Sequence, residues 1–317
     1  MFNTLFRHGI GVVSALALLL HTLILGTFLY LAILMKIISP KWLIIRVFDP
    51  IIVFIASMWL EGIIWWINWV YRPKWHIDNP EPLNKKDWYL LTANHQSWVD
   101  IFVLYQLFHQ KAPFLKFFIK KELQYVPIVG QAWWALDFPF MRRYSKEFLQ
   151  EHPEKAGDDI KETQKACEKF SLVPTSVMNF LEGTRYTPSK HKKQGSPHRH
   201  LLKPKAGGIA FTIQALGDKF SSLTNATIVY PDHIPTFWDM MCGNIDHIYV
   251  EVSSTPIPQH FSQGNYQTDP SLKQEVQNWV TQLWQQKDQD IARILQAHEH
   301  SLMATDKLSK NKSYWPF

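Results

Sequence analysis

Two long apolar segments open the chain, and a different pattern follows them. Residues Gly9 to Met35 are almost wholly apolar, with His21 as their one titratable side chain. A membrane-spanning helix needs about 20 apolar residues, so this segment is long enough to cross a bilayer. A cleaved signal peptide is the competing interpretation. The apolar run is longer than a typical signal core, and no small-x-small cleavage site follows it, so we expect a retained helix.

A second apolar segment runs from Ile51 to Val70 and is interrupted by Glu61. Tryptophans crowd its later half, at Trp59, Trp65, Trp66 and Trp69. Because tryptophan is enriched at the membrane–water interface, the segment is either a second span or a helix lying in the headgroup region. If both segments span, the rest of the chain shares one side with the N-terminus. Basic flanking residues then make that side cytoplasmic, at Arg7, Arg72, Lys74, Lys85 and Lys86.

From Lys74 onward, short apolar runs alternate with amphipathic segments, which is typical of an α/β fold. The predicted strands are Trp75–Ile77, Trp88–Thr92, Phe114–Phe118, Ala135–Pro139, Ser176–Leu181, Ala226–Tyr230 and Ile248–Val252. The predicted helices are Trp98–Phe108, Glu147–Phe170, Gly207–Leu216 and Leu272–Leu295. We therefore expect a mixed, largely parallel sheet of about seven strands flanked by helices. The expected division is membrane-anchoring helices at 1–72, an α/β domain at 73–300 and a disordered tail at 301–317.

Composition narrows the class of protein. Hydrophobic residues make up 46% of the 317 residues and charged residues only 19%, which is oily for a water-soluble protein. The net charge of +6 suits an anionic membrane surface or a phosphorylated substrate, with nucleic acid as the other usual partner. The only cysteines, Cys167 and Cys242, form no metal spacing and no disulfide framework. Lys190–His200 is basic and histidine-rich, but its spacing fits no standard metal site, so we expect a solvated loop.

The stretch from Thr92 to Asp100 carries the strongest chemical signal. An apolar run precedes it and a helix is expected to follow, so His95 should lie at a strand-to-helix turn with Asp100 about one turn further on. A histidine there can take a proton from a hydroxyl, and a buried carboxylate would orient the ring. No serine or cysteine nucleophile accompanies the pair, so the attacking group is expected to be a hydroxyl of the substrate. The competing interpretation is a structural histidine bonded to a backbone carbonyl.

Basic residues follow several other predicted strands. Glu182, Gly183, Thr184 and Arg185 come after one of them, and the guanidinium of Arg185 is suited to phosphate. Arg142 and Arg143 end another apolar run. Further lysines lie between these elements or at the start of a predicted helix, where free backbone N–H groups favour anions; they are Lys120, Lys121, Lys203 and Lys205.

This set of residues resembles the glycerolipid acyltransferase family of the lysophosphatidic acid acyltransferase (PlsC) type. The family's N-H-x4-D block is matched by Asn94, His95 and Asp100, and its E-G-T-R block by Glu182–Arg185. Phe140–Arg143 resembles the F-x-x-R block, although Asp137 and Pro139 depart from the usual residues before it. Thr227–Pro231 resembles the fourth block loosely, and Lys120–Gly130 the segment between the first two. Trp279, Trp284, Lys287 and Asp288 resemble a pattern in one branch of these enzymes.

The resemblance implies an enzyme of phospholipid biosynthesis that moves a fatty acyl group from acyl-CoA or acyl carrier protein to lysophosphatidic acid. His95 would be the general base and Asp100 its orienting partner. Arg143 and Arg185 would hold the acceptor phosphate, with Glu182 positioning it, and backbone amides near Gly183 and Thr184 would stabilise charge. Further contacts to donor or phosphate are expected from Lys121, Lys203 and Lys205.

The same resemblance implies no metal and no bound cofactor, because a thioester is already activated. Expected partners are a lysophospholipid acceptor, the thioester donor and membrane lipid, with no nucleic acid. The expected location is a bacterial inner membrane, with the active site on the cytoplasmic side. Two alternatives remain open: acylation of another lysophospholipid, and a non-catalytic membrane protein whose basic loops bind nucleic acid or anionic lipid.

Overall fold

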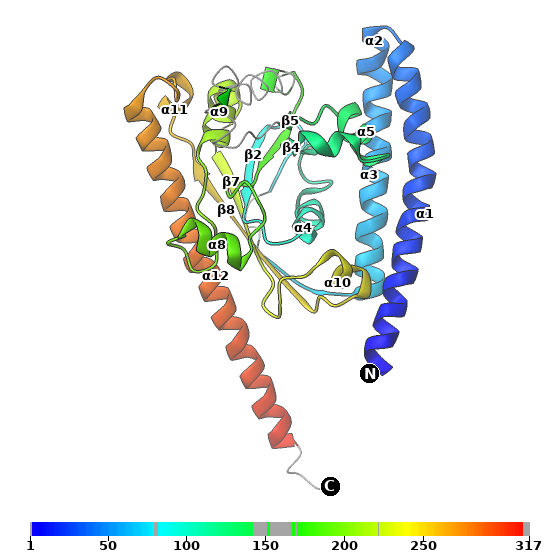
Figure 1. The fold of residues 1–317 in the computed structure, drawn as a ribbon, viewed down its shortest axis with the longest axis vertical. Coiled ribbons are helices and arrows are strands. Elements are labelled where there is room, and N and C mark those ends of the chain that lie inside the picture. The colour runs from blue at the N-terminus through cyan, green and yellow to red at the C-terminus, as the bar shows by residue number, and fades with distance from the viewer. Residues whose placement is uncertain are drawn as a thin grey trace.

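The fold has three layers: a pair of long helices, a twisted sheet, and a second group of helices on the opposite face (Figure 1). A computed structural model describes residues 2–78, 82–141, 151–152, 167–168, 170, 172–220 and 222–312. Most of the helix expected over Glu147–Phe170 lies outside the described residues, as do Arg142 and Arg143.

The apolar N-terminal segments form an antiparallel helical hairpin. Helix α1 (Phe2–Ile38) is followed by the short α2 (Lys41–Leu43), the π-helical turn η1 (Ile44–Phe48), α3 (Asp49–Trp66) and η2 (Ile67–Tyr71). Two stretches, Thr4–Ile38 and Lys41–Tyr71, are long and apolar enough to cross a membrane. The two arms approach closely at Gly62, where a Cβ would meet the His21 ring at 2.5 Å, so a side chain there would push the helices apart.

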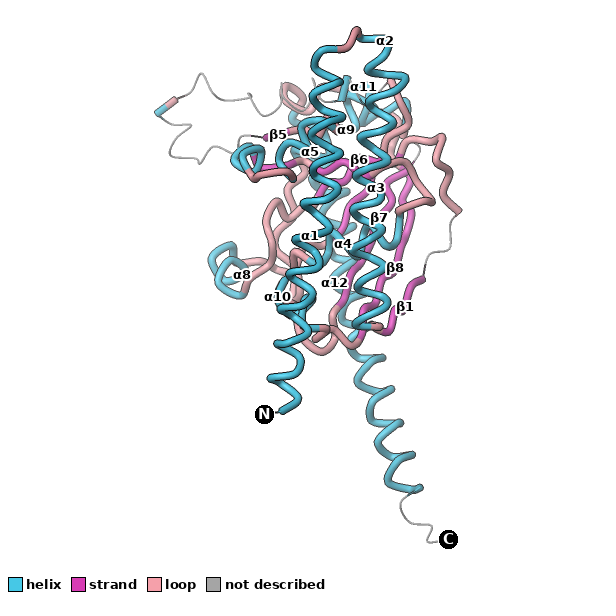
Figure 2. The backbone as a smooth tube through the Cα atoms, turned by 90° about the vertical axis from the view of Figure 1, so that its right-hand side faces the viewer, coloured by secondary structure: helices cyan, strands magenta, loops and turns pink. Residues whose placement is uncertain are grey.

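The hairpin packs lengthwise against the α/β domain (Figure 2). Near the N-terminus, Arg7 donates to the side chain of Asn244 at 2.7 Å. Near the other end of α1, Lys36 Nζ donates to the carbonyl of Ala135 at 2.9 Å. Between these points, a Cβ on Gly26 would lie 2.9 Å from Ile128. One side of the hairpin is therefore covered by the domain, while its other side exposes many large apolar residues, among them Leu16, Leu20, Phe28, Leu31, Ile45 and Phe54.

The main sheet has the strand order β1-β8-β7-β2-β6-β3, and every neighbouring pair is parallel except β7 and β8. Its strands are β1 (Lys74–Asp78), β2 (Tyr89–Ala93), β3 (Leu115–Phe117), β6 (Ser176–Asn179), β7 (Ser222–Val229) and β8 (His247–Pro256). A second parallel pair consists of β4 (Ile119–Lys120) and β5 (Phe140–Met141). The predicted fold class, a mixed and largely parallel sheet flanked by helices, is confirmed, with six strands in the main sheet.

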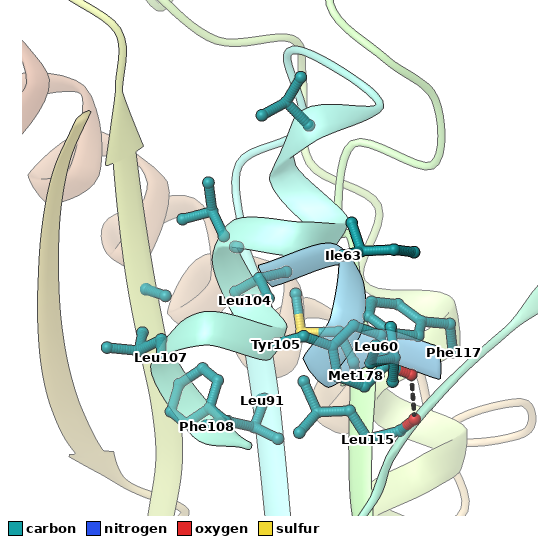
Figure 3. Packing of buried hydrophobic residues seen from close by; sticks show 14 of the residues in the cluster. Leu60, Ile63, Leu91, Leu104, Tyr105, Leu107, Phe108, Leu115, Phe117 and Met178 are labelled. Atoms are coloured by element: carbon teal, nitrogen blue, oxygen red, sulfur yellow. Dashed lines mark hydrogen bonds between the residues drawn. The ribbon is translucent and has the colours of Figure 1, made fainter. Parts of the chain in front are cut away.

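Two hydrophobic cores lie on opposite faces of this sheet because successive residues of a strand point to opposite sides. Leu91 and Met178 face α3 and α4 (Val99–Phe108), as Figure 3 shows. Leu90 and Val177 belong to the other core, with α9 (Gly207–Leu216) and α12 (Pro270–Lys312). The remaining elements are η3 (Lys121–Tyr125), α5 (Val129–Ala135), α8 (Pro188–Gln194), η5 (Gly217–Lys219), α10 (Phe237–Cys242) and α11 (His260–Gln263).

Two predicted elements differ from the structure. The strand expected at Ala135–Pro139 is wrong: α5 ends at Ala135, and the chain turns through Asp137, whose φ is +57°. The loop expected over Lys190–His200 is wrong in its first part, because α8 continues to Gln194. Thr187 caps this helix by accepting from the Lys190 amide, a local start signal that the basic composition concealed.

The disordered tail expected at 301–317 also differs, since α12 continues as a helix to Lys312 and residues 313–317 lie outside the described part of the chain. Neither glycine nor proline occurs between Ser271 and Lys312, so no residue in this range breaks the helix.

Candidate active site

His95 lies at the turn that joins β2 to α4, at the carboxyl end of a central parallel strand. Asn94 fixes the turn to the neighbouring strand β7. Its Nδ2 donates to the carbonyl of Ile228 at 2.8 Å, and its Oδ1 accepts from the Ile228 amide at 2.9 Å. Ser97 fastens the other end of the turn, because its Oγ donates to the carbonyl of Pro235 at 2.5 Å. The backbone around His95 is therefore held on both sides.

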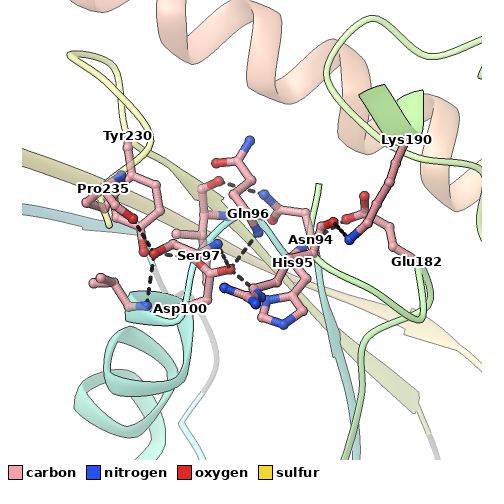
Figure 4. A network of polar contacts seen from close by, with 12 residues as sticks. Asn94, His95, Gln96, Ser97, Asp100, Glu182, Lys190, Tyr230 and Pro235 are labelled. Carbon is pink, nitrogen blue, oxygen red and sulfur yellow. Dashed lines mark hydrogen bonds and ion pairs between the residues drawn. The ribbon is translucent and has the colours of Figure 1, made fainter. Parts of the chain in front are cut away.

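Asp100 holds the His95 ring by a hydrogen bond between its Oδ2 and Nδ1, at 2.9 Å (Figure 4). The carboxylate is fully buried. The same Oδ2 accepts from the backbone amides of Gln96 at 2.6 Å and Ser97 at 2.8 Å, and Oδ1 accepts from the Tyr230 hydroxyl at 2.8 Å. Burial and the adjacent Asp100 carboxylate raise the pKa of Tyr230, so its hydroxyl stays a donor. This network positions the acid that orients the imidazole.

The second ring nitrogen of His95, Nε2, has no hydrogen-bond partner among the described residues. The ring stacks on Phe180, with centroids 4.0 Å apart, which leaves its side chain 14% exposed. With Nδ1 donating to Asp100, Nε2 presents a lone pair toward the accessible side. The arrangement is that of a general base, and it favours this interpretation over a histidine bonded to a backbone carbonyl.

Glu182 lies behind the histidine rather than on the surface. It is fully buried, and its Oε1 accepts from the His95 amide at 2.8 Å while Oε2 accepts from the Leu202 amide at 2.9 Å. Burial raises its pKa, while these two amides and the charge of Lys287 act in the opposite direction. The expectation that Glu182 contacts the substrate does not fit this burial, because both oxygens face backbone donors. Its observed role is to join the His95 turn to the segment before α9.

Helix α12 supports this arrangement from the opposite face of the sheet. Lys287 is fully buried, and its Nζ donates to the Ala226 carbonyl at 2.5 Å and to the Thr227 hydroxyl at 3.2 Å. Burial lowers the pKa of Lys287, and the carboxylate of Glu182 counteracts that shift. The sequence pattern contained Lys287 and Asp288 but indicated no role for either, because their partners lie 61 and 89 positions away in the sequence.

Asp288 binds the segment that reaches Glu182. Its Oδ2 accepts from the Arg199 amide at 2.8 Å, and its Oδ1 accepts from the His200 amide at 2.7 Å. Two residues later, the Leu202 amide donates to Glu182. A continuous chain of hydrogen bonds therefore runs from α12 through Glu182 to the backbone of His95.

Basic side chains lie along the rim of the site. The Arg185 guanidinium is exposed and lies over the Trp98 ring, 4.7 Å from its centroid. Lys190 Nζ donates to the Thr184 hydroxyl at 2.8 Å and to the Arg185 carbonyl at 3.0 Å. Sequence reasoning missed Lys190, because the helix that turns it toward Thr184 was expected to be a loop. The Gly183 amide donates to the Phe180 carbonyl at 2.9 Å and closes a tight turn after β6.

The remaining expected contacts lie at different distances from this centre. Lys203 and Lys205 follow the buried Leu201–Leu202 segment that supplies the Leu202 amide, and the Lys205 amide donates to the Leu181 carbonyl at 2.7 Å. Lys121 begins η3, which packs against β4, β5 and α5 in a separate layer. Arg143 lies outside the described residues.

A family model described as "Acyltransferase" matches residues 74–232, half of the chain. The chain is similar to 1-acyl-sn-glycerol-3-phosphate acyltransferase delta of Homo sapiens, with 27% identity over 192 residues, covering 55% of this chain and 43% of that protein. It is also similar to lysocardiolipin acyltransferase 1 of Gallus gallus, with 23% identity over 221 residues, covering 65% and 53%. The match thus spans about half the length of these relatives.

A comparison with solved structures found the 1-acyl-sn-glycerophosphate (LPA) acyltransferase PlsC from Thermotoga maritima. The identity is 16% and the TM-score 0.43, over 85% of this chain and 97% of that chain. The matched region of the family model contains the His95–Asp100 pair, Glu182, Arg185 and Tyr230. The chain belongs to the acyltransferase family.

Proposed function

We propose that this protein is a membrane-bound enzyme that transfers a fatty acyl group from acyl-CoA or acyl carrier protein to the free hydroxyl of lysophosphatidic acid. The product is phosphatidic acid. The observation that carries the proposal is the buried Asp100 carboxylate bonded to Nδ1 of His95. Arg185 lies over the ring of Trp98, three residues after His95, and the Tyr186 amide next to Arg185 donates to the His95 carbonyl, so a cation and the base come from joined segments.

The proposed reaction needs one proton transfer in each direction. Nε2 of His95 takes the proton of the acceptor hydroxyl as its oxygen attacks the thioester carbonyl carbon. Asp100 stabilises the imidazolium that forms, and its bonds to Gln96, Ser97 and Tyr230 keep it in place. When the carbon–sulfur bond breaks, the imidazolium returns the proton to the leaving thiolate. An ester and a free thiol result.

Recognition of the acceptor phosphate is assigned to the cations at the rim. Arg185 offers a planar set of donors that suits a phosphate, and its stacking on Trp98 limits the positions that the guanidinium can adopt. Lys190 adds a second positive charge beside it. Arg143, Lys203, Lys205 and Lys121 remain proposed contacts to phosphate or donor, and Lys121 is the weakest of them because it begins a different layer.

The apolar side of the hairpin supports a membrane location, because the acceptor and product are both membrane lipids. We further propose the cytoplasmic side of a bacterial inner membrane, on the basic residues that flank the apolar segments.

A second candidate within the same chemistry is acylation of a different lysophospholipid. The similarity to a protein named lysocardiolipin acyltransferase favours keeping it, because that name specifies another acceptor. Both candidates require the same base and the same thioester, and they differ only in the headgroup at the rim.

The test is acyl transfer by detergent-purified protein offered a panel of lysophospholipids with acyl-CoA or acyl carrier protein. Product mass and free thiol are measured, with His95→Ala as the inactive control. We expect lysophosphatidic acid to give the highest kcat/KM. A higher value with another lysophospholipid would select the second candidate, and no thiol release above the control with any acceptor would refute both.

A further inference from the structure

A cluster of metal-binding side chains lies at the edge of the sheet, apart from the His95–Asp100 pair. Asp232 follows β7, His247 begins β8, and His298 lies on α12. One ligand atom from each residue lies within 4.8 Å of the other two. His247 Nδ1 is 3.3 Å from Asp232 Oδ2, and His298 Nε2 is 3.7 Å from Asp232 Oδ1. Three segments that are distant in sequence therefore bring two imidazoles and a carboxylate together.

His298 has an unsatisfied nitrogen that points into this cluster. The residue is 4% exposed, and its buried Nε2 has no hydrogen-bond partner in the part of the chain that the structure describes, because 3.7 Å to Asp232 is too long for a hydrogen bond. Most buried polar groups are hydrogen-bonded, so this one requires an explanation. His298 Nδ1 lies 3.1 Å from the Tyr249 hydroxyl. If Nδ1 donates its proton to that hydroxyl, Nε2 keeps the lone pair that a metal ion needs.

We propose that Asp232, His247 and His298 bind one divalent transition-metal ion, with Zn²⁺ as the first choice. Zinc bonds to imidazole nitrogen and carboxylate oxygen are about 2.0–2.2 Å long and tetrahedral, which separates neighbouring ligand atoms by about 3.3–3.5 Å. The separation of 3.3 Å from His247 to Asp232 Oδ2 lies in that range, and that of 3.7 Å from His298 to Asp232 Oδ1 lies just above it, so the two histidines face different oxygens of the carboxylate. Imidazole with a single carboxylate also favours zinc over magnesium or calcium, which prefer oxygen ligands.

The site is open to ions on one side. The Asp232 side chain is 36% exposed, so water can complete a four-coordinate ion and the ion can enter from solvent. A further histidine, His76 on β1, lies nearby, with its ring centroid 5.8 Å from that of His247.

The location indicates a structural role for the ion. It would join α12 to the loop after β7 and to β8, in the same helix that carries Lys287 and Asp288. Its proposed ligand Asp232 lies two residues after Tyr230, whose hydroxyl donates a hydrogen bond to Asp100. The ion would therefore stabilise the folded chain and take no part in acyl transfer.

The experiment uses the full chain, purified in detergent and stripped with EDTA. Zn²⁺ is titrated by calorimetry, Co²⁺ by visible absorption, and the unfolding temperature is measured with and without Zn²⁺. We expect one ion per chain, an intense Co²⁺ spectrum typical of four-coordination, and a higher unfolding temperature with Zn²⁺. Asp232→Asn and His298→Gln should each lower the affinity at least tenfold. The control His233→Gln alters a neighbouring exposed histidine and should bind like the parent.

The unfolding temperature in EDTA distinguishes a variant that has lost a metal ligand from one that no longer folds properly. Without metal, the ligand variants should unfold at the same temperature as the EDTA-treated parent. The histidine-rich segment with His191, His198 and His200 provides the competing location. Zn²⁺ binding that survives in Asp232→Asn/His298→Gln but disappears in His191→Gln/His198→Gln would overturn the proposal. A weak octahedral Co²⁺ spectrum in the parent protein would overturn it without any variant.

Discussion

At the scale of single residues, the Asp100 carboxylate accepts hydrogen bonds from His95, Gln96, Ser97 and Tyr230. Only the first of these orients the base directly. The others hold the carboxylate in place. Substitutions at this site therefore divide into those that remove the base and those that disturb its support.

Removing the base should nearly abolish activity. His95→Ala should lower kcat by about 10²–10⁴-fold, because a positioned base contributes that much. Asp100→Asn should also lower kcat steeply, and the double variant should be no worse than His95→Ala alone, because base and orienting acid act as one unit. Specific activity and thermal unfolding are measured on the same preparations. A folded His95→Ala protein with parental activity would show that the histidine is structural.

Tyr230→Phe tests the support of the carboxylate. It removes one donor from the buried Oδ1 of Asp100, and losing one such hydrogen bond costs about 1–1.5 kcal/mol, so kcat should fall about tenfold. The matched control is Tyr105→Phe, which removes a buried hydroxyl bonded to the Leu115 carbonyl within the core (Figure 3). Both variants should lose stability, but only Tyr230→Phe should lose kcat. Equal kcat values in the two variants would contradict the supporting role.

Arg185→Ala tests recognition of the phosphate. Losing a charge-assisted contact costs about 1.5–3 kcal/mol, so kcat/KM for lysophosphatidic acid should fall about tenfold to a hundredfold. Lys192→Ala removes an exposed cation from α8 and is the control, since no described contact links its side chain to the rim. The acceptor is compared with an uncharged monoacylglycerol. An equal loss with both acceptors would mean that Arg185 does not bind the phosphate.

At the scale of elements, α12 holds the segment that supports Glu182. Asp288→Asn should lower kcat about tenfold, because one of two backbone amides would face an N–H₂ group and the path through Leu202 to Glu182 would loosen. Glu275→Gln is the control on the same helix, where the carboxylate bonds the exposed side chain of His260. Activity per folded molecule is compared after thermal unfolding of each variant. If the two variants are equally active, α12 is not a support of the site.

At the scale of the whole molecule, the hairpin's packing decides how the chain meets the membrane. Helix α1 has 37 residues and is about 55 Å long, well above the roughly 30 Å of a hydrocarbon core. Yet it contacts the polar α/β domain at both ends, through Arg7 and through Lys36. A bilayer cannot surround the hairpin completely while the domain beside it stays in water. We therefore expect the hairpin to lie in one leaflet with its exposed apolar side toward lipid.

Cysteine labelling checks this arrangement. Lys41→Cys, at the hairpin turn, and Lys193→Cys, on α8, should both resist a membrane-impermeant thiol reagent in intact cells and react after permeabilisation. The native Cys167 and Cys242 are buried and give the background. Labelling of Lys41→Cys alone from outside would mean that both arms cross the bilayer. Labelling of Lys193→Cys from outside would contradict the cytoplasmic orientation.

The sequence by itself determined the local elements and the family. Period-two and period-3.6 patterns predicted strands within one or two residues at β1, β2, β3 and β6, and the helix at Gly207–Leu216 without change, whereas β7 begins four residues before the predicted strand. The spacing of His95 and Asp100 was also sufficient to predict that their side chains meet. Five positions across a strand-to-helix turn leave the two side chains few other arrangements. The Ala135–Pro139 prediction failed since its apolar residues fill a core without forming a strand, which no short pattern distinguishes.

Only the tertiary structure decided which distant groups meet. Lys287 and Asp288 reach β7 and the Arg199–His200 backbone across the sheet, and Asp232, His247 and His298 converge from three elements. Glu182 looked like a surface ligand until the fold buried it between two backbone amides. The first apolar segment was expected to span a membrane and the second to span it or to lie in the headgroup region, and the fold covers one side of this hairpin with protein. Composition records how apolar a segment is, whereas its neighbours in the fold determine which side remains for lipid, substrate or metal.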